Sequence, residues 1–217
     1  MNNLKQKGFT LVEIAIVLVI VGLLIGGVLK GQEMITNAKL KLIESDNAGI
    51  AAAMFSYQDR YLQLPGDDSG AGGPAATPGR FSDLILAADN GNGDGVIEGV
   101  WTGGAGIETS KFWRHLRASG LIPGSPQDIT QPSNAYGGKI GIRDGSLGIS
   151  GHVTVFGQID GPIAKIIEAR LDDSTPNTGR VMAAIAGAGL DGVMDAGIAG
   201  AAATYNDDLR YNMAFRL

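Results

Sequence analysis

An apolar run of 21 residues, from Phe9 to Leu29, constrains this chain more than any other feature of its sequence. The run contains one charged side chain, Glu13, and follows a short polar segment that carries Lys5 and Lys7. As a helix it is roughly 32 Å long, which is enough to cross the ~30 Å hydrocarbon core of a bilayer. Positive charges favour the cytoplasmic side of a membrane helix, so we expect residues 30–217 to lie outside the cytoplasm.

Two ordinary explanations of such a run are a secretory signal peptide and a simple signal anchor. A signal peptide has an apolar core of about 7–15 residues and a small-residue cleavage site after it. The run here is longer, and no Ala-x-Ala-like site follows it between Gly26 and Gln32. A signal anchor is the stronger alternative of the two.

The acidic residue Glu13 within the apolar run is not expected in an ordinary signal peptide or signal anchor. A carboxylate inside an apolar span costs about 2.5–3.5 kcal/mol and marks a functional site by default, with a partner cation expected. The stretch Lys7-Gly-Phe-Thr-Leu-Val-Glu13 resembles the processing site of type IV prepilins and of the pseudopilins of type II secretion. In that family a prepilin peptidase cuts after the glycine and methylates the new amino group. The resemblance implies cleavage between Gly8 and Phe9, with Phe9 N-methylated.

The resemblance also implies a course of assembly. Residues 1–8 are the cleaved leader, and residues 9–29 lie in inner-membrane lipid before they join a filament core. The implied partners are the prepilin peptidase, other pilin subunits and an inner-membrane assembly platform, and the filament ends at the cell surface. The Phe9 amine of one subunit is then a natural counter-ion for Glu13 of a neighbour, which would fix axial register as buried polar residues do in coiled coils.

The particular machine stays open at this point. Many major type IV pilins have a proline where Lys30 stands here, and its absence fits minor pilins and type II secretion pseudopilins equally well. The favoured interpretation is a pilin or minor pilin. The alternatives are a pseudopilin, or a membrane-tethered calcium-binding or adhesive module that does not polymerise.

Beyond the apolar run, an amphipathic pattern predicts that the helix continues to residue 61. Ile43, Ile50, Met54, Tyr57 and Tyr61 are spaced to share one helical face. Pro65-Gly66 ends the pattern. We therefore predict one helix over residues 9–61 and a globular pilin-like domain over residues 62–217.

The globular part is predicted to be α+β, with the long helix packed on a small antiparallel sheet. Glycine, at 34 of 217 residues, indicates many turns and little further helix. The predicted short helices cover residues 108–118 and 163–171, and the predicted strands cover residues 139–142, 147–149, 152–159 and 211–216. The aromatic residues expected in the core are Trp101, Phe112, Trp113 and Tyr136. The paired acids expected in surface turns are Asp67/Asp68, Asp172/Asp173 and Asp207/Asp208.

One loop resembles a calcium-binding loop. Asn90, Asn92 and Asp94 occupy positions 1, 3 and 5 of an EF-hand-like pattern, and Gly95 occupies position 6. Asp89, Glu98 or a remote acid such as Asp67 or Asp68 would complete the ligand shell, because position 12 is Trp101. A solvated turn explains the same residues without a metal. A second acidic segment, residues 191–195, is a weaker candidate for metal binding, and we expect a plain turn there.

Other chemistry is disfavoured. The chain has no cysteine, which excludes disulfides and thiol catalysis. Its net charge of −5 and scattered basic residues give no nucleic-acid footprint. His115 and His152, the two histidines, have no triad context, and His115 is expected to pack or form hydrogen bonds. The sequence therefore predicts a structural protein rather than an enzyme.

Overall fold

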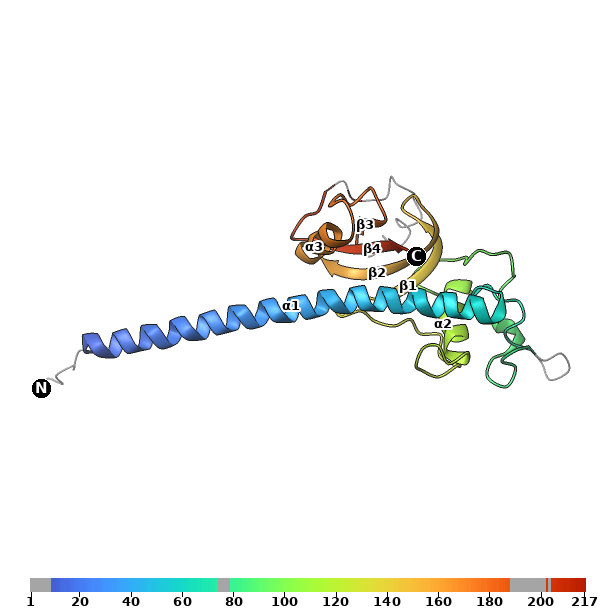
Figure 1. The fold of residues 1–217 in the computed structure, drawn as a ribbon, viewed down its shortest axis with the longest axis horizontal. Coiled ribbons are helices and arrows are strands. Elements are labelled where there is room, and N and C mark those ends of the chain that lie inside the picture. The colour runs from blue at the N-terminus through green and yellow to red at the C-terminus, as the bar shows by residue number, and fades with distance from the viewer. Residues whose placement is uncertain (1–8, 74–78, 188–201, 203) are drawn as a thin grey trace, which may run out of the picture. The chain divides into compact units, whose positions relative to one another are not determined.

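A computed structural model describes residues 9–73, 79–187, 202 and 204–217. The chain divides into two compact units, Met1–Lys41 and Leu42–Leu217. Helix α1 (Leu11–Tyr61, 51 residues) begins in the first unit and ends in the second (Figure 1). The long N-terminal helix predicted from the sequence is thus confirmed, and it starts two residues later than expected.

The ends of α1 have local causes. Thr10 precedes the first helical residue, and its side chain caps the helix as described below. No proline occurs before Pro65, so the backbone hydrogen bonds of α1 can continue without a break. After Tyr61 the backbone turns away because Leu62 adopts a positive φ of 56°.

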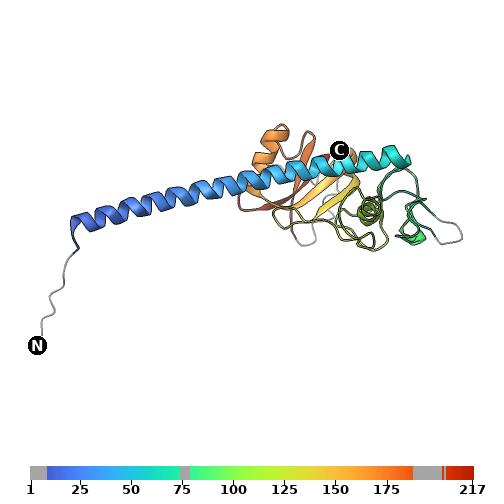
Figure 2. The ribbon, with the colours of Figure 1, turned by 60° about the horizontal axis from the view of Figure 1, so that its bottom comes forward.

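The part of α1 that follows Lys41 packs on the globular domain. Ile43, Ile50, Met54 and Tyr57 are buried, as their spacing predicts, whereas Tyr61 is only half-buried. This part of the helix crosses one face of the sheet in both ribbon views (Figures 1 and 2). A hydrogen bond from the Thr154 hydroxyl to the side chain of Asn47 joins the sheet to the helix.

The sheet has four antiparallel strands in the order β1-β2-β4-β3. Together with the helices this confirms an α+β fold with a small antiparallel sheet. The strands are β1 (Ile140–Ser146), β2 (Ile149–Asp160), β3 (Val181–Ile185) and β4 (Arg210–Arg216), and the shorter helices are η1 (Ala87–Asp89), α2 (Glu108–Ala118) and α3 (Gly161–Leu171).

Three features of the sheet differ from the sequence prediction. Strand β1 continues beyond the predicted residues 139–142 to Ser146. The predicted strand at 147–149 is wrong for Leu147 and Gly148, which have positive φ and form the turn where the chain reverses, while Ile149 and the segment predicted at 152–159 belong to one strand of 12 residues, β2. Strand β3 was not among the predicted strands. Its first four residues are all buried, so it lacks the alternation that identifies a strand with one solvent face.

Both faces of the sheet are covered. Thr154 and Phe156 lie on the α1 face, while Val153 and Val155 lie on the opposite face in a cluster with Trp101. A Cβ on Gly141 would overlap the Trp101 carbonyl oxygen and lie 2.9 Å from its ring, so the strand needs glycine there. Trp101, Phe112 and Trp113 are buried, which confirms their predicted place in the core. Tyr136 is only half-buried, so its predicted place in the core is wrong.

The prediction that Asp67 and Asp68 lie in surface turns is wrong, because both side chains are buried. Asp68 accepts hydrogen bonds from the Tyr57 hydroxyl (2.6 Å) and the Gly70 amide (2.8 Å), and it pairs with Arg80. Buried carboxylates are tolerated when several donors replace their water. This cluster ties the end of α1 to the loop that follows it.

Candidate functional site: the N-terminal segment and the acidic loop

Glu13, the predicted assembly residue, is held by Thr10 at the start of α1. The Thr10 amide and hydroxyl donate to Oε2 of Glu13 at 2.8 and 2.9 Å, and the Glu13 amide donates to the Thr10 hydroxyl at 3.2 Å. This reciprocal arrangement is a capping box, with threonine at the N-cap and glutamate at the third helical position. The Thr-x-x-Glu spacing is visible in the sequence, but the prediction did not use it.

The segment around Glu13 is long and apolar enough to span a membrane. Its most apolar stretch has a mean hydropathy of 2.8, and its large side chains from Leu11 to Leu29 are exposed. Gly22, Gly26 and Gly27 have no other atom within 4 Å of where a Cβ would stand. They leave shallow places at which another helix can approach closely.

The predicted cleavage site lies at the edge of the described chain. Phe9 is highly exposed, while Gly8 lies outside the described residues. Glu13 forms no ion pair with any residue that the structure describes. Among the residues that the structure describes, the segment therefore presents an apolar surface and one carboxylate that has no counter-charge.

Comparison with known families gives the same assignment for this segment. Residues 3–29 match the prokaryotic N-terminal methylation motif, the hallmark of type IV prepilin-like proteins. No curated protein and no solved structure gives a significant match to the chain.

The motif and the apolar helix support a type IV pilin-like or pseudopilin subunit. They imply processing by a prepilin peptidase and assembly with other pilin subunits, and they are consistent with inner-membrane anchoring. Proteins with this motif are generally structural rather than enzymatic.

Of the predicted calcium ligands, Asn90, Asn92, Asp94 and Glu98 lie in one loop, and Asp89 ends η1 directly before it. Most of these side chains have other partners. Asp89 pairs with Arg114, and the Asn90 side chain exchanges hydrogen bonds with the backbone of Gly72. The side-chain amide of Asn92 donates to Asp94 at 3.0 Å, and Glu98 is exposed. Calcium binding by this loop stays a prediction, and residues 191–195 lie outside the described residues.

Two buried carboxylates outside the loop determine its shape. Asp67 accepts the amides of Gly93 (2.6 Å), Asp94 (3.2 Å) and Gly95 (2.7 Å). Glu108, in the first turn of α2, accepts the amides of Asn92 (2.9 Å) and Glu98 (3.0 Å). The role of Glu108 was not predicted, because nothing in the local sequence pattern brings α2 to this loop.

His115 forms hydrogen bonds with the backbone of two residues near this loop, Gly66 and Asp89. The Gly66 amide donates to its Nδ1 at 2.9 Å, and its Nε2 lies 2.8 Å from the Asp89 carbonyl oxygen. Burial lowers the pKa of His115 to about 4. The ring is therefore neutral at pH 7 with Nε2 protonated, and it packs and forms hydrogen bonds as the sequence suggested.

Proposed function

We propose that the chain is a structural subunit of a type IV pilus-like filament, a pilin or minor pilin without enzymatic activity. It inserts in the bacterial inner membrane through residues 9–29 with the globular domain outside the cytoplasm. A prepilin peptidase cleaves it between Gly8 and Phe9 and methylates the Phe9 amine. The assembly platform then transfers the apolar helix from lipid into a filament at the cell surface.

The observation that carries this proposal is an exposed carboxylate in an apolar helix that bears the methylation motif. Glu13 lies within a membrane-length segment and has Thr10 but no cation as its partner in the described chain. An acid in that environment is costly, and a neighbouring subunit's Phe9 amine would compensate its charge. The exposed apolar side chains would then be buried between helices instead of in lipid.

A pseudopilin of type II secretion is the second candidate. Its support is the continuous course of α1 through Lys30, where many major pilins carry a helix-disturbing proline. This observation counts against a major pilin and fits a minor pilin equally well. Both candidates share the processing and the packing of the helix, and they differ in the machine that extracts the subunit.

Intact mass and N-terminal sequencing of the protein from its native host test the proposal. We expect a chain that begins at N-methylated Phe9. A chain that still begins at Met1 would indicate a signal anchor, and one that begins beyond residue 25 would indicate a conventional signal peptide. Either of these results would overturn the proposal.

Cross-linking in the native host then separates the alternatives. A processed subunit should cross-link to copies of itself or to other pilins through residues placed near Glu13. A processed chain that stays monomeric in the membrane would favour a tethered module that does not polymerise.

A further inference from the structure

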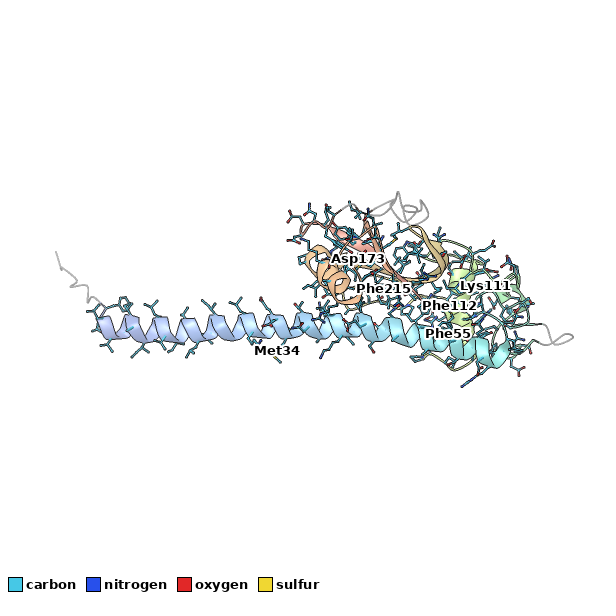
Figure 3. All side chains as sticks on the ribbon, turned by 45° about the horizontal axis from the view of Figure 1, so that its top comes forward. Met34, Phe55, Lys111, Phe112, Asp173 and Phe215 are labelled. Carbon is cyan, nitrogen blue, oxygen red and sulfur yellow. The ribbon has the colours of Figure 1, made fainter. Side chains whose placement is uncertain are left out.

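Three acidic side chains come together at the C-terminal end of α3, far along the chain from the acidic loop. Glu168 lies on the last turns of the helix, and Asp172 and Asp173 follow it, with Asp173 labelled in Figure 3. One oxygen from each carboxylate lies within 4.8 Å of the other two. Oxygens that each stand 2.3–2.6 Å from one calcium ion are up to roughly 5 Å apart, so the spacing fits a shared cation.

Glu168 supplies an independent observation at this cluster. Its side chain is fully buried, and Oε2 accepts a hydrogen bond from the Tyr205 hydroxyl at 3.0 Å. Its other oxygen, Oε1, is buried without a hydrogen-bond partner among the described residues. A buried carboxylate oxygen needs donors or a cation. No ion pair within the described part of the chain includes Glu168, Asp172 or Asp173.

The two aspartates are positioned by the backbone that follows them. Asp172 accepts the amides of Arg180 and Val181, the latter at 2.7 Å. Asp173 accepts the Thr175 amide at 2.9 Å and the Thr178 hydroxyl. Each carboxylate keeps free lone pairs after these bonds. The loop between α3 and β3 thus holds both side chains beside the buried Glu168.

We propose that Glu168, Asp172 and Asp173 bind a divalent cation of the calcium type. The three ligands are all carboxylate oxygens, which favour hard cations over zinc or copper. Asp173 is exposed and Asp172 is half-buried, so solvent reaches the site from their side while Glu168 closes it from the interior. The cation would neutralise the negative charge around Glu168 and join α3 to the start of β3.

The experiment uses the full chain purified in detergent and stripped with EDTA. Thermal unfolding is followed with and without CaCl₂, and terbium luminescence is excited through tyrosine, because Tyr205 contacts Glu168. Calcium should raise the melting temperature of the wild-type protein, and terbium should bind with sensitised emission that calcium displaces. If neither effect occurs, the proposal is wrong.

Glu168→Gln distinguishes a ligand from a structural residue. Glutamine has the same shape and still accepts from Tyr205, but it cannot ionise to bind a cation. The variant should melt at or above the wild-type temperature without calcium and show no increase when calcium is added. A variant that melts lower without calcium but keeps the full calcium effect would overturn the assignment.

Further variants locate the cation. Asp173→Asn, at an exposed position, should weaken terbium binding about tenfold or more. Asp208→Asn removes an exposed acid from another turn and should leave binding unchanged. Asp94→Asn tests the predicted loop at residues 89–98. If Asp94→Asn abolishes the calcium effect and Glu168→Gln does not, the cation binds in that loop, and the site proposed here does not exist.

Discussion

The hydroxyl of Thr10 donates to Oε2 of Glu13 at 2.9 Å, and the Glu13 amide donates back to the same hydroxyl at 3.2 Å. Glu13 thus has a local partner at the N-terminus of α1, where the helix dipole also favours a negative charge. A filament contact with a neighbour's amine would have to compete with this capping box. In the proposed filament, Glu13 would therefore exchange its local partner Thr10 for a neighbour's amine.

Substitution of the two partners separates capping from assembly. Thr10→Ala removes the hydroxyl from the capping box, at a cost of about 1 kcal/mol to the helix start, and leaves only the backbone amide of residue 10 to compete with an amine for Glu13. We expect this variant to reach filaments, whereas Glu13→Ala should insert in the membrane but stay out of them. Immunoblots of sheared filaments and membranes measure both. Normal incorporation of Glu13→Ala would contradict the proposed pairing.

Asp67→Asn should destabilise the globular domain by about 2–3 kcal/mol, because three backbone amides donate to this buried carboxylate. The asparagine amide would face these donors with its own hydrogens. Denaturant unfolding of the full chain in detergent measures the effect. Asp83→Asn is the matched control at an exposed position and should stay within about 0.5 kcal/mol of the wild type. Equal stability of both variants would show that Asp67 does not hold the loop.

His115 should make the domain sensitive to mild acid. Burial lowers its pKa from 6.5 to about 4, so the unfolded chain takes up the proton first. The stability that the neutral ring contributes is fully present above pH 6.5 and is lost as the pH falls toward 4. The difference between the two pKa values corresponds to on the order of 3 kcal/mol.

The His152→Gln variant isolates this effect, because His115 is then the remaining histidine. The free energy of unfolding should fall between pH 6.5 and 5 as in the wild type, and an NMR titration should place the His115 pKa well below 6.5. A normal histidine pKa would refute the linkage.

Two glycine-to-alanine changes should act in opposite directions. Gly141→Ala places a methyl group against Trp101 and should cost about 1–3 kcal/mol through overpacking. Gly49→Ala lies on the exposed side of α1 with open space around it and should stabilise the domain by about 0.5–1 kcal/mol. Chemical unfolding of the two variants side by side checks both signs. A destabilising Gly49→Ala would mean that this helix face is not open.

Local sequence patterns predicted the elements that depend on local interactions. The apolar run and the spacing from Ile43 to Tyr57 identified α1, and α2 was predicted with its observed bounds, Glu108–Ala118. Strand β4 was placed within one residue. Strand β3 was not predicted, because Val181–Ala184 is buried without interruption and shows no alternation of apolar and polar residues.

The buried acids also could not be predicted from local sequence, because their partners lie elsewhere in the chain. Asp67 and Asp68 look like a turn in the sequence, and their burial depends on donors 2 to 28 residues further along and on Tyr57. Glu108 gave no signal of its role, since its partners are amides of a glycine-rich loop. Around the predicted cleavage site the signal is local, because Gly8, Phe9 and Glu13 lie within one short motif. The motif is identified from the sequence alone, and the individual roles of these residues stay predictions.

The hydrogen bonds from backbone amides to Asp67 and Glu108 bear on which residues of the acidic loop can be substituted. Five amides between Asn92 and Glu98 are fixed by these two acids, while the side chains of Asn92, Asp94 and Glu98 are exposed. The conformation of the loop is therefore set largely by residues outside it. Substitution of the exposed side chains can therefore change the chemistry of the loop surface while the backbone conformation stays the same. Such a surface can vary during evolution without loss of the fold.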